Sequence, residues 1–239
     1  MHTVAIIPAA GFGLRLKNRT SKPLVEIQGI PIIVYTLKAI SGHPLIKEVI
    51  VVANPSNIRT IKHKIKQYRI KKISQVVLGG ATRRCSVENG LNALSGRADF
   101  VLIHDAVRPF IRRNTISAVI KAAQRRGAAI VGVPVKATIK RVSNLKPQAS
   151  ERLVIKETVD RSNLWEIQTP QVFRKDLIIK AYKKFKDKDV TDDAMLVEKM
   201  GGGVSMVLGS YDNIKVTTPE DLILAEAICG KFAQTTYVH

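Results

Sequence analysis

Short apolar runs alternate with amphipathic segments along the first half of the chain. Residues 4–7, 49–52, 73–78, 100–103 and 129–135 are rich in Val, Ile and Leu, as strands buried in a sheet are. Between them, residues 31–40, 56–68, 86–94 and 115–126 place apolar side chains at helical spacing. This order predicts an α/β fold with a doubly wound, mostly parallel sheet. In such sheets ligands bind beyond the carboxyl ends of the strands.

The alternation breaks after residue 135. Residues 138–142 and 152–158 resemble two strands around the turn-rich stretch 144–150, which predicts an inserted β-hairpin arm over about residues 138–160. A lone hairpin is marginally stable in water, so we expect the arm to pack on another surface, such as a second subunit. Helices at 175–186, 192–200 and 219–228 and a strand at 204–208 then resume the pattern. We predict one domain over residues 1–239, with the arm as its insertion.

The composition is that of a globular protein, with 45% hydrophobic and 24% charged residues. No apolar run is long enough to cross a bilayer, and the first three residues lead directly into an apolar run. We therefore expect no membrane segment and no signal peptide. Cys85 and Cys229 lie far apart without the spacing of metal ligands. These features favour a reduced, cytoplasmic protein.

The net charge of +20 is unevenly distributed. Residues 49–87 contain nine Lys or Arg and no acid, and residues 106–150 contain ten more, again with no acid. Such a field attracts polyanions, including triphosphates, sugar phosphates and nucleic acids. Most of these charges lie beside apolar residues at helical spacing, so a solvated helix face is the simpler interpretation.

A glycine-containing loop follows the first predicted strand. Residues 8–16 read Pro-Ala-Ala-Gly-Phe-Gly-Leu-Arg-Leu, and Arg15 and Lys22 add two cations to backbone N–H groups that suit an anion. A dinucleotide-binding fingerprint would need glycine at Leu16, and a P-loop would end in Gly-Lys-Ser/Thr. The loop suits a nucleoside triphosphate, and the alternative is a plain turn with a chance arginine. The candidate nucleotide-binding residues here are Pro8, Ala9, Ala10, Gly11, Phe12 and Gly13.

Other polar groups also follow predicted strands. Asp105 could meet a magnesium ion or a hydroxyl, and Arg108 could hold a phosphate, although a cap with a surface ion pair is the alternative. We expect His104 to be structural. Lys215 could neutralise a phosphate. A second glycine turn could line a base or ribose pocket through Gly80, Ala81, Arg83 and Ser86.

Taken in order, these segments resemble one family. The residues that carry the likeness are the glycine loop to Arg15, Lys22, His-Asp-Ala-Val-Arg-Pro at 104–109, Thr-Val-Asp-Arg at 158–161, Gln-Thr-Pro-Gln at 168–171, Thr-Asp-Asp at 191–193 and Asp-Asn-Ile-Lys-Val-Thr at 212–217. The chain is similar to the 2-C-methyl-D-erythritol 4-phosphate cytidylyltransferases over nearly its whole length. The resemblance implies a Rossmann-like nucleotidyltransferase fold and Mg²⁺-dependent transfer of CMP from CTP to methylerythritol phosphate, with release of pyrophosphate. It also implies a homodimer in which each arm helps to complete the partner's site.

The resemblance also implies roles for single residues. Arg15 and Lys22 would stabilise the charge that develops on the α-phosphate, and Arg161 and Lys215 would position the acceptor phosphate. The acceptor or metal region would be lined by Asp105, Arg108, Thr138, Thr169 and Thr191, with Asp105 as the candidate metal ligand. The acceptor phosphate is already an anionic nucleophile, so positioning and electrostatics suffice without a catalytic His or Cys.

Two other functions are compatible with parts of the sequence. The nearest is a cytidylyltransferase for another polyol phosphate, such as ribitol 5-phosphate, but the Pro-Ala-Ala-Gly and Thr-Val-Asp-Arg stretches favour methylerythritol phosphate. A nucleic-acid-binding protein is suggested only by the net charge. Aromatic residues make up only 5% of the chain and no binding motif is present, so we expect no nucleic-acid partner.

Overall fold

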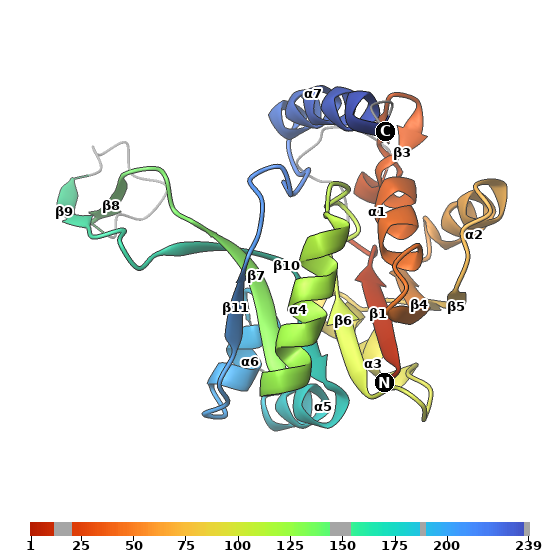
Figure 1. Ribbon diagram of the computed structural model, residues 1–239, viewed down its shortest axis with the longest axis horizontal. Coiled ribbons are helices and arrows are strands. Elements are labelled where there is room, and N and C mark those ends of the chain that lie inside the picture. Colours follow the sequence, from red (N-terminus) through yellow and green to blue (C-terminus); the bar gives the residue numbers. More distant parts are fainter. Residues whose placement is uncertain (12–20, 144–153, 187–189, 237–239) are drawn as a thin grey trace.

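The computed structural model describes residues 1–11, 21–143, 154–186 and 190–236. Its centre is a seven-stranded sheet in the order β11-β7-β10-β6-β1-β4-β5. The strands are β1 (Thr3–Pro8), β4 (Ile46–Ala53), β5 (Ile73–Leu78), β6 (Phe100–Ile103), β7 (Ala128–Pro134), β10 (Trp165–Arg174) and β11 (Ser205–Leu208). Figure 1 shows the sheet with helices on both sides. The predicted doubly wound, mostly parallel α/β fold is confirmed.

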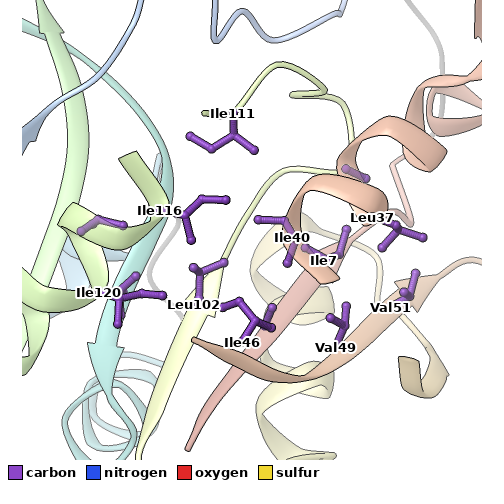
Figure 2. Packing of buried hydrophobic residues seen from close by; sticks show 14 of the residues in the cluster. Ile7, Leu37, Ile40, Ile46, Val49, Val51, Leu102, Ile111, Ile116 and Ile120 are labelled. Carbon is purple, nitrogen blue, oxygen red and sulfur yellow. The ribbon is translucent and has the colours of Figure 1, made fainter. Parts of the chain in front are cut away.

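The helices divide between the two faces of the sheet. On one face, α1 (Ile32–Ser41), α2 (Ile58–Gln67) and α4 (Arg113–Arg126) contribute to one buried apolar cluster with the strands, part of which Figure 2 shows. On the other face, α3 (Arg83–Asn92), α5 (Lys175–Lys184) and α6 (Ala194–Glu198) form a second cluster. Strand residues alternate between the clusters: Ile7 belongs to the first and Ile6 to the second. This explains why a central strand such as β6 is apolar throughout.

A third apolar cluster lies over the carboxyl end of the sheet. It joins the short hairpin of β2 (Glu26–Ile27) and β3 (Ile30–Pro31) to α7 (Pro219–Thr236), through residues such as Ile27, Val216 and Ile228. Between β1 and this hairpin lies the 3₁₀ helix η1 (Lys22–Leu24). The cluster therefore holds the β2–β3 hairpin and α7 together over the end of the sheet where ligands are expected.

Strand β10 was not predicted. It lies between β6 and β7 and runs antiparallel to both, with its register shifted between Gln168 and Gln171. Pro170, which follows a cis peptide bond, falls within this shift. Proline has no N–H to donate to a ladder, which is why the Thr-Pro segment does not read as a central strand.

Two predicted helix boundaries were wrong by three residues or more. The helix expected at 86–94 begins at Arg83, because the Thr82 hydroxyl accepts a hydrogen bond from the Cys85 N–H and caps it. The last helix extends to Thr236 rather than ending at residue 228. No helix in the described part of the chain is long and apolar enough to cross a membrane.

The predicted hairpin is present. Strands β8 (Ile139–Val142) and β9 (Ile155–Val159) pair with each other in a separate antiparallel sheet. In Figure 1 this arm projects beyond the ends of β7 and β10, away from the helices. Apolar side chains on it are exposed to solvent, including Val154 at 62% and Ile155 at 57%.

Candidate functional site

A cavity of about 240 Å³, here called the first cavity, opens at the carboxyl ends of β1, β5 and β6. The glycine loop and the second glycine turn both line it. All the predicted nucleotide-binding residues that the structure describes line this cavity: Pro8, Ala9, Ala10, Gly11, Gly80, Ala81, Arg83 and Ser86. Lys22, Asp105 and Lys215 add charged side chains to its lining. Phe12, Gly13 and Arg15 lie outside the described residues.

The second glycine turn is held by its own helix. The hydroxyl of Ser86, on the first turns of α3, accepts a hydrogen bond from the Gly80 N–H at 3.2 Å and donates to the Thr82 carbonyl at 2.9 Å. A side chain at Gly80 would collide with Cys85, because its Cβ would lie 2.4 Å from the Cys85 Cβ. Glycine is therefore required at this position for the turn to pack against α3.

Asp105 lies at the centre of a cationic cluster. Its Oδ1 contacts Arg83 Nε at 3.3 Å, and its Oδ2 contacts Lys215 Nζ at 3.0 Å and Arg108 Nε at 3.4 Å. Burial disfavours the charged form, yet Arg83, Lys215 and Arg108 together hold the pKa of Asp105 far below its ordinary value. Asp105 is therefore a carboxylate at any physiological pH.

A second buried carboxylate balances Arg83. Arg83 Nη2 donates to Asp193 Oδ2 at 2.9 Å, and the Tyr182 hydroxyl donates to the other oxygen of Asp193. Although burial works against its charge, Asp193 and Asp105 raise the pKa of Arg83 further. Gln171 on β10 positions Asp193 by accepting its backbone N–H at 3.1 Å. Arg83 thus links Asp105 to Asp193 through charge-assisted contacts.

His104 has the structural role that we expected. It is fully buried, and its ring contacts the Thr169 hydroxyl at 2.9 Å and the Arg108 carbonyl at 3.0 Å. Thr169 in turn accepts a hydrogen bond from the Asp105 N–H at 3.0 Å. Burial lowers the pKa of His104 to about 4, so the ring is neutral near pH 7.

A second cavity adjoins the first. Its lining includes Arg108, Thr169 and Thr191, and it shares Arg83, Asp105 and Lys215 with the first cavity. One wall is apolar and consists of Ile130, Ile167, Met195 and Met206. Thr191 does not cap α6, which begins at Ala194, and it is Asp192 Oδ1 that accepts the Met195 N–H at 3.1 Å. The Thr191 side chain is instead exposed in the cavity lining.

Two predicted acceptor residues lie apart from both cavities. Thr138 and Arg161 flank the arm, are exposed, and belong to neither lining. The Arg161 guanidinium donates to the Lys136 carbonyl at the base of the arm. The structure therefore brings together Asp105, Arg108, Thr169, Thr191 and Lys215, but leaves the residues of the arm outside that group.

Sequence reasoning missed several supporting residues. Asp193 and Tyr182 contact Arg83 or each other, and Asn54 and Asn57 contact the start of the glycine loop. The Asp-Asp pair after Thr191 was a signal for Asp193. The others were hidden, because their partners are distant in sequence.

Known proteins resemble this chain along almost its whole length. A family model for 2-C-methyl-D-erythritol 4-phosphate cytidylyltransferase matches residues 3–231. The cytidylyltransferase of that name from Alkaliphilus metalliredigens is 45% identical over 95% of this chain and 92% of its own length. The one from Bacillus licheniformis is 42% identical over 95% of this chain and 96% of its own.

Solved structures agree with the sequence matches. A 4-diphosphocytidyl-2C-methyl-D-erythritol synthase from Anaerococcus prevotii superposes with a TM-score of 0.81 at 34% identity, covering 95% of this chain and 96% of that one. The 2-C-methyl-D-erythritol 4-phosphate cytidylyltransferase from Thermus thermophilus gives 0.74 at 33% identity, covering 96% and 100%. These matches show that the chain belongs to the 2-C-methyl-D-erythritol 4-phosphate cytidylyltransferase family.

Proposed function

We propose that this cytidylyltransferase binds CTP in the first cavity and methylerythritol phosphate in the second. The observation that carries the proposal is the wall common to both cavities, which consists of Arg83, Asp105 and Lys215. Two substrates that react must meet, and here one set of charged side chains borders both spaces. Lys215 reaches Asp105 at 3.0 Å and remains 41% exposed, so its ammonium group is available to a phosphate entering from either side.

The chemistry follows from the charges. An oxygen of the acceptor phosphate attacks the α-phosphorus of CTP, and the bond from that phosphorus to the bridging oxygen breaks, which releases pyrophosphate. The nucleophile is already anionic, so no proton needs to be removed. The described lining of the two cavities contains neither His nor Cys, as a reaction driven by positioning and electrostatics permits. Arg15 and Lys22 are the proposed cations at the α-phosphate.

The acceptor site uses a similar logic. Arg108 and Lys215 contact the same Asp105 carboxylate and line the second cavity, where they would hold the acceptor phosphate. Burial lowers the pKa of Arg108, but its contact with Asp105 favours the charged form. Thr169 and Thr191 offer hydroxyl groups to a polyol, although the Thr169 hydroxyl also bonds the Asp105 N–H.

Mg²⁺ is part of this proposal. The described residues contain no group of three or more His, Cys, Asp or Glu side chains that could hold a metal ion. Asp105 fits a magnesium ion that arrives with the triphosphate, because Mg²⁺ is commonly held by one or two carboxylates plus substrate phosphates. Among the described residues, Arg83 Nε contacts Asp105 Oδ1 at 3.3 Å, and this oxygen retains a lone pair for the ion. When bound, the ion would neutralise part of the triphosphate charge.

A homodimer built through the arm is also proposed. The arm exposes Val154 and Ile155, and the strands at its base expose Trp165, Ile167 and Leu208. Apolar groups of this kind favour a second copy as a cover. In such a dimer the Thr138 and Arg161 of each arm would reach the acceptor site of the other subunit. Replacing residues 144–150 with a short glycine turn should weaken dimerisation and raise the acceptor KM without changing CTP binding. A variant that stays a dimer with an unchanged acceptor KM would overturn this assignment.

We further propose a cytoplasmic location. Cys85 and Cys229 are both unpaired thiols in the structure, which suits a reducing compartment. Cell fractionation with an antibody to the chain would test this assignment.

The role of the two cations is tested by Arg15→Ala and Lys22→Ala. Each variant should lower kcat by on the order of a hundredfold or more, the usual cost of losing one preorganised charged contact. CTP affinity, measured by calorimetry, should change far less than kcat. If both variants lost CTP affinity and kept full turnover at saturation, the two residues would be binding groups and the assignment would be wrong.

A further inference from the structure

Two buried asparagines contact the start of the glycine loop without lining either cavity. Asn54 follows β4 and is 3% exposed, and Asn57 directly precedes α2 and is 1% exposed. They bind each other reciprocally. Asn57 Oδ1 accepts the Asn54 N–H at 2.9 Å, and Asn54 Oδ1 accepts the Asn57 N–H at 2.9 Å. The pair therefore forms a compact polar unit in the interior of the protein.

The Asn57 side chain does not cap the helix that follows it. Asparagine at a helix start usually caps the first turn with its side-chain oxygen, but Asn57 makes no such bond. Its amide instead donates to the Ala9 carbonyl at 2.9 Å and to the Ser21 hydroxyl at 2.8 Å. Asn54 adds a donation to the Ala10 carbonyl at 3.0 Å. Both asparagine side chains thus point toward the segment that borders the first cavity.

These contacts join two pieces of the cavity wall. Ala9 and Ala10 directly follow β1, and Ser21 directly precedes Lys22, where η1 begins. The Ser21 carbonyl accepts the Leu24 N–H at 2.8 Å, so the position of Ser21 also sets the position of η1. One amide nitrogen, Asn57 Nδ2, therefore connects the residue before Lys22 to the strand end that faces the same cavity.

We propose that Asn57 and the Ser21 hydroxyl are positioning residues that hold Lys22 at the wall of the first cavity. This proposal rests on the proposed role of Lys22 in turnover. Asn57 acts through Ser21 and touches no substrate. A small displacement of a catalytic cation is costly in rate, because the benefit of a preorganised charge depends on its distance from the reacting phosphorus.

The decisive test is Ser21→Ala, with Ser21→Thr as its matched control. The alanine variant removes the hydroxyl and leaves the Asn57–Ala9 bond, while the threonine variant keeps a hydroxyl at the same place. Ser21→Ala should lower kcat roughly three- to tenfold, the range expected for one lost hydrogen bond, with little change in CTP affinity. Ser21→Thr should restore most of the rate. Equal kcat for the wild-type chain and the alanine variant would overturn the proposal.

A double-mutant comparison separates positioning from a general effect on the fold. In the Lys22→Ala background, Ser21→Ala should have no further effect on kcat, because there is no longer a cation to position. If the effect of Ser21→Ala were equally large in that background, the hydroxyl would act elsewhere and the proposal would be wrong.

A second variant covers the asparagine itself. Asn57→Asp keeps the shape but replaces the donor that faces the Ala9 carbonyl with an acceptor, so it should lower kcat more than Ser21→Ala does. Its thermal unfolding is measured in parallel, and a variant that is folded and fully active would refute the role of Asn57. The proposed function fails differently: if Lys22→Ala alone retained normal kcat, the role of Lys22 would be wrong whatever the Ser21 variants show.

Discussion

The buried histidine beside the site makes stability depend on pH. His104 is fully buried between the Thr169 hydroxyl and the Arg108 carbonyl, and burial lowers its pKa from 6.5 to about 4. Asp105 favours the charged ring, but this effect is smaller than that of burial. The neutral ring is therefore the form that the folded chain accommodates.

The direction in which stability changes with pH follows from proton uptake. Between pH 6.5 and about 4 the unfolded chain binds a proton at this ring and the folded chain does not, so stability is fully present above pH 6.5 and falls as the pH is lowered. The difference between the two pKa values corresponds to about 3 kcal/mol of unfolding free energy. The pKa of His43 is also lowered by burial, so His43 contributes in the same direction.

The comparison that isolates His104 uses His104→Asn. Urea unfolding of both chains at intervals from pH 7.5 to pH 4.5 gives the free energy of unfolding at each pH. At pH 7.5 the variant should be less stable by about 1–3 kcal/mol, because it loses the contacts of the ring. As the pH falls the two curves should converge, since only the wild-type chain carries the His104 titration. Parallel curves over this range would refute the assignment.

Two further predictions concern packing and the Arg83 network. Tyr182→Phe should destabilise the chain by about 1–3 kcal/mol, because the buried Asp193 carboxylate loses a hydroxyl donor; urea unfolding measures it, and an unchanged midpoint would contradict it. Gly90→Ala should also destabilise, by about 1–3 kcal/mol, because the new Cβ would lie 2.5 Å from Ile6 Cγ2 in the core. The matched control is Gly230→Ala in α7, where no described atom lies within 4 Å of the added Cβ, and it should be neutral or stabilising.

The alternation of apolar runs predicted six of the seven central strands. Four of them, β1, β4, β6 and β7, are largely buried and read as nearly continuous apolar runs. The edge strands β5 and β11 are partly exposed but still rich in apolar residues. Strand β10 was not predicted, because its sequence is not a continuous apolar run. Its Trp-Glu-Ile-Gln half leaves Trp165 and Ile167 partly exposed, and Pro170 lies within its register shift. The pairing partners of such a strand are set by tertiary structure rather than by local propensity.

The site was predictable wherever its residues follow strands. The glycine loop, Asp105 and Lys215 meet because parallel strands end at one edge of the sheet, which a pattern of strands already implies. The network that supports them was not predictable. Tyr182 and Asn57 look like ordinary core and helix-start residues, and their roles depend on partners 11 and 36 or more positions away in the sequence.

Pyrophosphate release is the direct measure of the proposed reaction. The purified chain is supplied with CTP, Mg²⁺ and either methylerythritol phosphate or ribitol 5-phosphate, and pyrophosphate is followed by a coupled assay. We expect release that requires both CTP and acceptor and is much faster with methylerythritol phosphate. The Lys215→Met variant should need more acceptor for the same rate. Faster release with ribitol 5-phosphate, or an acceptor dependence that Lys215→Met leaves unchanged, would contradict the proposed arrangement of the two cavities.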